Sequence, residues 1–140
     1  MKLWFNFRIL GLEEIGRFFD HGIRLAETAQ KAFGELENWK IVTPAQLAIM
    51  NFSYVFWSET ADCERVEVVP ASESVNVEVS KRAIAQNIAA PLTTRLLGRL
   101  NLRMCTISPL LMTEQLVEIV HVLDSLAEQV AAELRCLKSI

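Results

Sequence analysis

The segment GRLNLRMCTISP, residues 98–109, carries the clearest fold signal in this 140-residue chain. Leucines and a methionine occupy every second position and alternate with Arg99, Asn101, Arg103 and Cys105. A period of two predicts a half-buried β-strand with one face toward a core and the other toward solvent. Both arginines fall on the solvent face, where each is either simply solvated or held out to bind an anion.

Three further strands are expected near this one. PLTTRLLG (91–98) precedes it directly, and Gly98 would supply the turn of a hairpin between the two. WKIVT (39–43) and QLAIMNFSYVF (46–56) are rich in β-branched and aromatic residues. Because only a short link containing Pro44 separates them, we expect these two strands to be neighbours.

Amphipathic helices are expected at both ends of the chain. Residues 12–35 repeat apolar side chains at a spacing of three to four, and Gly11 predicts a break from the apolar segment 3–10. Thr113 is predicted as the N-cap of a long C-terminal helix. The expected buried residues of the first helix are Leu12, Ile15, Phe19, Ile23, Ala26, Ala29 and Phe33. Those of the last helix are Leu116, Ile119, Val120, Leu123, Ala127, Val130 and Leu134.

The middle of the chain gives weaker signals. Residues 58–74 are polar and include a proline, which predicts a loop or insertion. Residues 75–89 begin with alternating valines, but their later composition favours a helix, and we predict a helix there. The resulting order predicts an α+β fold, with a small antiparallel sheet of about four strands, helices packed on one face and helices at the N-terminus. The length suits one domain, residues 1–140.

Composition excludes several classes of function. The chain has 14 basic and 17 acidic residues, a net charge of −3, and no dense basic patch, so we expect no nucleic-acid partner. No apolar run is long enough to span a membrane, and the N-terminal segment lacks the features of a signal peptide. The hydrophobic fraction of 51% is nevertheless high for so small a domain. This predicts apolar surface that a protein partner, or a missing part of the same protein, would cover.

The sequence contains no self-sufficient active site. Its three cysteines, Cys63, Cys105 and Cys136, are odd in number and lack CxxC spacing, so we expect reduced thiols in a cytoplasmic protein and no disulfide or zinc site. His21 and His121 are expected on helix surfaces. Phosphate-binding glycine loops and nucleophile motifs are absent. From these patterns alone we predict no catalytic residue, no metal site and no bound cofactor.

Two groups of residues resemble the C-terminal domain of the group II pyridoxal-phosphate-dependent decarboxylases, which act on aromatic amino acids, glutamate, histidine and diaminobutyrate. The first group is Lys2-Leu3-Trp4, Gly11, His21 and Leu25-Ala26. The second is Thr94, Leu96, Gly98, Arg99, Leu102, Arg103, Pro109 and Thr113. The two groups lie in the family's order and together span nearly the whole chain. The resemblance implies a small antiparallel sheet with helices on one face, as the patterns above predict independently.

The resemblance also implies that a cofactor-binding part is missing. In the family a lysine that follows a histidine, within a large upstream domain, holds pyridoxal phosphate. None of the five lysines of this chain follows a histidine. The chain would therefore be a C-terminal piece of such an enzyme, or a stand-alone gene product equivalent to one, and would be inactive alone. Its expected partner is a large cofactor-binding domain or subunit. From its apolar surface we also expect self-association. Leu3, Trp4, Phe5 and Phe7 would lie against that absent domain.

For Arg103 the resemblance implies a substrate-binding role. The family's arginine at this position pairs with the α-carboxylate of the amino-acid substrate, a task suited to the planar, permanently charged guanidinium. The alternative is that Arg103 is a surface strand charge paired with a glutamate. Arg99 is expected to be structural or to lie at an interface.

Two departures from the family leave the substrate open. Ser108 precedes Pro109 where the family usually has asparagine, and Ser53 stands where a basic residue is common. A second class of function also stays open at this stage. The chain could be a free-standing α+β interaction or small-carboxylate-binding module without catalysis. A chain that stays monomeric and soluble in solution would favour this alternative.

Overall fold

A computed structural model describes residues 2–59 and 65–138, with the side chains of residues 2, 3, 5–7, 59 and 138 excepted. The elements are α1 (Lys2–Gly34), β1 (Trp39–Gln46), β2 (Ile49–Tyr54), β3 (Trp57–Glu59), β4 (Arg65–Glu67), α2 (Val69–Ala85), β5 (Leu92–Leu96), β6 (Arg99–Cys105) and α3 (Thr113–Lys138). Four strands form an antiparallel sheet in the order β1-β2-β6-β5, and β3 and β4 pair as a separate hairpin. The α+β prediction is confirmed.

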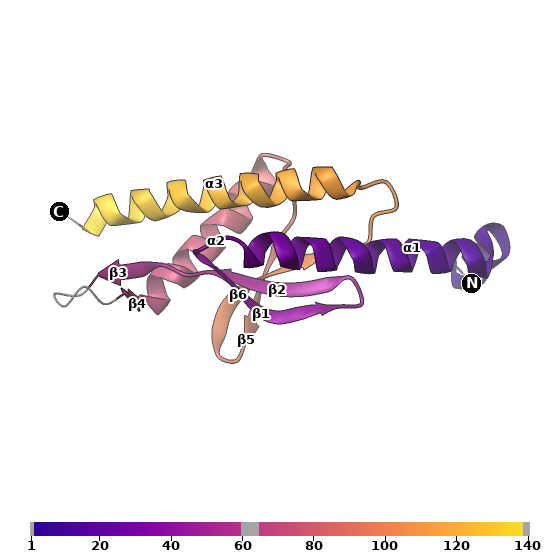
Figure 1. Ribbon diagram of the computed structural model, residues 1–140, viewed down its shortest axis with the longest axis horizontal. Coiled ribbons are helices and arrows are strands. Elements are labelled where there is room, and N and C mark those ends of the chain that lie inside the picture. The colour runs from indigo at the N-terminus through magenta and orange to yellow at the C-terminus, as the bar shows by residue number, and fades with distance from the viewer. Residues whose placement is uncertain (1, 60–64, 139–140) are drawn as a thin grey trace.

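The helices lie on one face of the sheet (Figure 1). α1 packs on β1 and β2, α2 packs on β2, β5 and β6, and α3 packs against α1 and α2. The core between these layers is aromatic at its centre. Phe33 of α1 stacks on Phe52 of β2 with ring centroids 4.3 Å apart, and Trp39 meets Tyr54 edge-on at 5.4 Å. Burial of such rings is the largest stabilising contribution that a small α+β fold has available.

The predicted break at Gly11 is confirmed. Gly11 has φ 77° and ψ 160°, a conformation that interrupts the helical path inside α1. Of the apolar stripe predicted beyond it, Ala26, Ala29 and Phe33 are buried. Leu12 and Phe19 are not: they are 75% and 54% exposed. The prediction was wrong for these two because the first half of α1 extends past the end of the sheet (Figure 1), so the sheet does not cover its apolar side there.

Both predicted hairpins form, but the first turns later than expected. β1 runs through Pro44 to Gln46, and the two-residue turn is Leu47-Ala48, with φ 49° and 62°. Two positive φ angles are typical of a type I′ turn, whose twist matches that of the flanking strands. Pro44 is tolerated inside β1 because this strand is at the sheet edge. Gly98 lies in the second turn, as predicted, with φ 76°.

The predicted loop 58–74 is wrong on both sides of the undescribed residues 60–64. β3 and β4 occupy its first part, and α2 begins at Val69 rather than near residue 75. The reason lies in the side of α2 that faces the sheet. That side carries the buried polar residues Ser72, Asn76 and Ser80, spaced four apart, so the hydrophobic periodicity that identifies a helix is diluted.

Most of the buried stripe predicted for α3 is confirmed, although Ile119 and Leu134 are only partly buried. Thr113, predicted as the N-cap, is instead the first helical residue. The helix starts at Thr113, and the Met112 carbonyl accepts the first helical hydrogen bond from Leu116 N–H at 3.1 Å. The Gln115 side chain reaches back to accept from Met112 N–H at 3.0 Å. The Gln115 contact is one half of a capping box, with Met112 in the N-cap position in place of Thr113. Across the described parts of the chain, no helix combines the length and apolarity that a membrane crossing requires.

Candidate functional site on the open face of the sheet

The sheet face opposite the helices, here called the open face, carries the residues that the strand pattern predicted to be wet. Along β6, Leu102 and Met104 are buried in the core, whereas Arg103 and Cys105 are exposed. Their neighbours across the ladder share the same faces, because side chains alternate strictly along paired strands. Arg103 pairs in register with Asn51 of β2 and Leu92 of β5.

Arg99 and Arg103 differ in what they contact. The Arg99 guanidinium donates through Nη2 to Glu67 Oε1 of β4, forming an ion pair between the sheet and the β3–β4 hairpin. For Arg103, by contrast, no hydrogen bond or ion pair to another described residue is present. Asn51, its neighbour, already donates to Thr43 Oγ1 at 2.7 Å. The glutamate partner considered for Arg103 is therefore found on Arg99.

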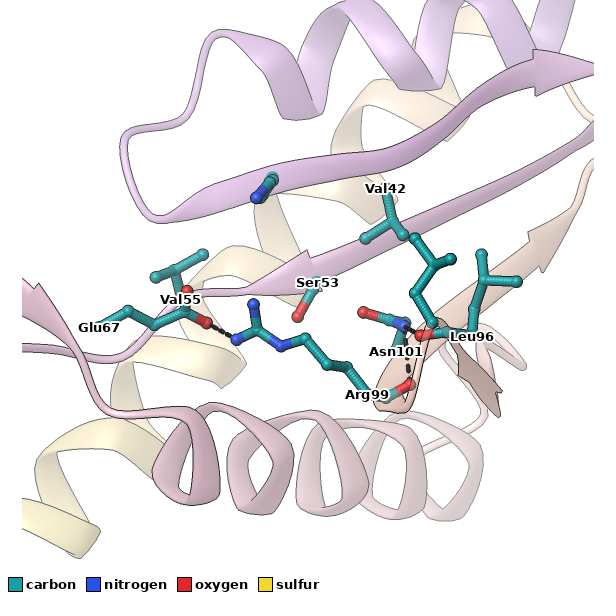
Figure 2. Close-up of a pocket in the computed structure, with 9 residues that line it drawn as sticks. Val42, Ser53, Val55, Glu67, Leu96, Arg99 and Asn101 are labelled. Atoms are coloured by element: carbon teal, nitrogen blue, oxygen red, sulfur yellow. Dashed lines mark hydrogen bonds and ion pairs between the residues drawn. The ribbon is translucent and has the colours of Figure 1, made fainter.

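A cavity of about 260 Å³ opens beside Arg99 on this face (Figure 2). We call it the open-face cavity; its lining residues are Lys40, Val42, Ser53, Val55, Glu67, Leu96, Leu97, Arg99 and Asn101. Asn101 is only 3% exposed. Its amide nitrogen donates to the carbonyls of Leu96 and Arg99 at 3.3 and 2.9 Å, which turns its Oδ1 into the cavity (Figure 2).

The cavity exists because β2 and β6 separate there. Their ladder ends at Phe52 and Leu102. Beyond this point, Asn76 of α2 bonds to the backbone groups of both strands from the covered side of the sheet. Tyr54 N–H donates to Asn76 Oδ1 at 2.9 Å, and Asn76 Nδ2 donates to the Leu100 carbonyl at 3.3 Å. A buried polar side chain thus replaces a missing rung of the sheet and pairs both the Tyr54 N–H and the Leu100 carbonyl.

The covered side of the sheet holds the other polar network. The Tyr54 hydroxyl donates to Glu128 Oε1 of α3 at 2.9 Å, and Trp39 Nε1 donates to Asp124 Oδ1 at 2.8 Å. Burial, followed by the hydrogen bond to the Glu128 carboxylate and its negative charge, holds the pKa of Tyr54 well above its ordinary value. This network joins α3 to the sheet and is remote from the open face.

The histidines and cysteines predicted to be unremarkable have mixed roles. His21 is half-buried, and its Nε2 lies 2.9 Å from the Leu111 carbonyl oxygen, so it ties α1 to the segment between β6 and α3. Cys105 and Cys136 are free and exposed, while Cys63 lies outside the described residues. Among the described side chains no three histidine, cysteine or carboxylate groups gather as metal ligands.

The open-face cavity does not suit pyridoxal phosphate. That cofactor needs a lysine for its aldehyde and a carboxylate for its ring nitrogen. Lys40 lines the cavity, but the lining carboxylate, Glu67, is already paired with Arg99. The donors here fit a small anion better than they fit the cofactor.

Sequence reasoning placed Arg99, Asn101 and Arg103 on one face, and the structure confirms that placement. It missed Lys40 and Glu67, which reach the same site from β1 and β4. The position of Lys40 could be predicted in part. Once β1 and β2 are taken as neighbouring strands, Lys40 pairs with Ser53 and lies on the same face of the sheet. Glu67 was not, because its segment was expected to be a loop.

Comparison with known proteins supports the resemblance carried by the two residue groups. No family model matches the chain. Over 136 residues it is 32% identical to the aromatic-L-amino-acid decarboxylase of Bacillus atrophaeus, covering 97% of this chain and 27% of that protein. The chain thus spans about a quarter of the length of this relative.

Solved structures share the fold. Oryza sativa TDC with PLP superposes with a TM-score of 0.77 at 17% identity, covering 93% of this chain and 26% of that one. The glutamate decarboxylase domain of diaminobutyrate-pyruvate transaminase and L-2,4-diaminobutyrate decarboxylase from Vibrio parahaemolyticus gives a TM-score of 0.68 at 17% identity, covering 91% and 25%. Sequence and fold agree: the chain belongs with the C-terminal domain of the group II pyridoxal-phosphate-dependent decarboxylases.

Proposed function

We propose that this chain is the C-terminal domain of a pyridoxal-phosphate-dependent amino-acid decarboxylase, in which Arg103 binds the α-carboxylate of the substrate. The observation that carries the proposal is an exposed arginine, without a partner among the described residues, on the open face of a chain similar to an aromatic-L-amino-acid decarboxylase. A permanently charged group without a counter-ion is available for an anionic ligand.

The position of Arg103 suits a binding role. Leu102 and Met104, on either side, are fixed in the core, so the backbone that carries Arg103 is held rigidly by the sheet. A planar guanidinium can then meet a carboxylate with two parallel hydrogen bonds, which sets the direction of the substrate as well as its affinity. Bound elsewhere in the enzyme, pyridoxal phosphate would supply the electron sink for decarboxylation. Arg103 contributes binding and orientation only.

The remaining parts of the enzyme would cover the apolar surface of this chain. Trp4, Ile9, Leu12 and Phe19 are all exposed on the half of α1 that extends beyond the sheet (Figure 1). Such a surface supports docking of a large cofactor-binding domain or subunit, with self-association through the same surface in its absence. The proposal includes inactivity of the chain alone and, from its cysteine usage, a cytoplasmic location.

A chimeric enzyme tests the proposal. The 136-residue segment of the Bacillus atrophaeus relative that matches this chain would be replaced by it, and decarboxylation of an aromatic amino acid would be measured. We expect Arg103→Gln to lower kcat/KM by about 100-fold, since a truncated charge pair costs roughly 2–5 kcal/mol. Arg95→Gln, at an exposed position of β5, is the matched control and should change it less than about twofold.

Two results would contradict the proposal. If the Arg103→Gln chimera kept the activity of its parent, Arg103 would not bind the substrate. If the parent chimera folded but showed no activity, this chain would not replace the enzyme's own domain, and the non-catalytic module would become the better account.

A further inference from the structure

The open-face cavity is separate from the position of Arg103. Arg99, which lines it, lies four residues before Arg103 on β6, a distance of about 13 Å along a strand. Arg103 is not among the lining residues. A ligand small enough for the cavity would therefore be bound by Lys40, Ser53 and Asn101.

These three residues form a row across the sheet. Lys40 pairs with Ser53 in the β1–β2 register, and Asn101 follows on β6, one residue before the last β2–β6 rung. Neighbouring strands lie about 5 Å apart, so the flexible Lys40 side chain is long enough to bring its ammonium group over the row. Asn76, from below, donates to Ser53 Oγ at 2.8 Å and keeps the strands apart. The cavity is thus held open by a buried side chain.

The charge of the cavity favours an anion. Its lining contains two cations, Lys40 and Arg99, and one carboxylate, Glu67. Glu67 and Arg99 neutralise each other through their ion pair. Lys40 is left with no counter-ion among the described residues, so the net charge facing a ligand is positive.

Asn101 adds a second requirement. Both of its amide hydrogens are used by backbone carbonyls, so its Oδ1 faces the cavity as a fixed acceptor. A plain carboxylate has no hydrogen to donate to it. A ligand that also carries a hydroxyl or ammonium group would satisfy this acceptor, whereas burying Oδ1 under a group without a donor would be costly.

The size and walls of the cavity limit the rest of the ligand. A volume of about 260 Å³ is that of roughly nine water molecules, so it accommodates about nine or ten non-hydrogen atoms. Val42, Val55, Leu96 and Leu97 supply an apolar wall. We propose that the open-face cavity binds a small hydroxy- or amino-carboxylate with an apolar tail, its carboxylate on Lys40 and its donor group on Asn101 Oδ1.

Nuclear magnetic resonance titration of the full 140-residue chain tests this site. The probes are 2-hydroxy-4-methylpentanoate and 4-methylpentanoate, which differ by the one hydroxyl. We expect saturable shifts of the Asn101 side-chain amide and the Arg99 backbone amide, with the hydroxy acid binding about fivefold tighter. Lys40→Gln should weaken binding about tenfold, the effect of one charge-assisted hydrogen bond. Lys81→Gln, on the exposed side of α2, is the control and should leave binding unchanged.

Three outcomes would overturn the site: no saturable shift at Asn101, equal affinity for the two probes, or binding that Lys40→Gln leaves intact. The titration also separates this site from the proposed function. If Arg103→Gln, rather than Lys40→Gln, removed binding, the carboxylate would lie on Arg103, and the cavity would be no site of its own. Failure of the chimera would leave the cavity result unaffected, because the titration involves no decarboxylation.

Discussion

The two faces of the sheet use the same strands for different purposes. On the covered face, Met50, Phe52, Leu102 and Met104 are buried against the helices. The polar groups that enter this face, such as Asn76 and Tyr54, are paired. On the open face the polar groups are only partly paired. Arg99 has Glu67, whereas Arg103 and Lys40 have no counter-ion among the described residues. Complete pairing is what stability requires, and incomplete pairing at a rigid position is what ligand binding requires.

The clearest test of this contrast is a substitution on each face. Phe52→Ala removes a fully buried ring that stacks on Phe33, and we expect a loss of about 3–5 kcal/mol in the free energy of unfolding. Arg103→Gln, on the open face of the neighbouring strand, should change it by less than about 0.5 kcal/mol. Urea denaturation of the two variants measures both. Similar losses would mean that the open face is structural as well.

The next largest loss of stability is expected when Asn76, which replaces the missing hydrogen-bonded rung between β2 and β6, is removed. Asn76→Ala leaves the Tyr54 N–H and the Leu100 carbonyl without their partner in a buried position, at a cost of roughly 2–4 kcal/mol. Ser74→Ala, on the exposed side of the same helix, is the matched control and should cost well under 1 kcal/mol. Equal stability of the Asn76 variant and the parent would show that the strands close up without the asparagine.

The covered network also gives the molecule a response to alkaline pH. Because the folded pKa of Tyr54 is raised above its unfolded value of about 10, its contribution to stability is complete below pH 10 and is lost as pH rises beyond it. Tyr54→Phe removes the hydrogen bond to Glu128 and should cost about 1–3 kcal/mol at pH 7. Thermal melts between pH 8 and about 12 would then show a shallower alkaline decline in the variant. A parallel decline in both proteins would assign it to other groups.

The smallest effect is expected from the pair that joins the sheet to the β3–β4 hairpin. Arg99 and Glu67 are both partly exposed, so a double-mutant cycle with Arg99→Gln and Glu67→Gln should give a coupling energy of about 0.2–1 kcal/mol. A coupling of several kcal/mol would mean that this pair holds the open face together and is no surface contact.

The features that could be predicted from the sequence are those whose pattern lies within a single helix or strand. The alternation of Leu102, Arg103 and Met104 is visible within one strand, so both faces of β6 were predictable from the chain alone. The Arg99–Glu67 pair joins residues 32 apart, through a segment expected to be a loop, and no local pattern indicates it.

The polar side of α2 was the harder problem. Ser72, Asn76 and Ser80 are buried because they bond to backbone groups in and beside the strands. The partners are Phe56 N–H, Tyr54 N–H and the Pro91 carbonyl. Sequence periodicity treats such residues as solvent-facing, so it placed the helix start too late. The same buried asparagine separates β2 from β6 and opens the cavity, which is why the cavity could not be foreseen either.

The central claim is that Arg103 binds a substrate carboxylate. Its most direct test compares the affinity of phenylalanine and of phenethylamine, which lacks the carboxylate, for the chimeric enzyme and for its Arg103→Gln variant. We expect the variant to bind phenylalanine at least tenfold more weakly and phenethylamine almost unchanged. If the substitution weakened the binding of both ligands equally, or of neither, the claim would be contradicted, because Arg103 would then not bind the carboxylate.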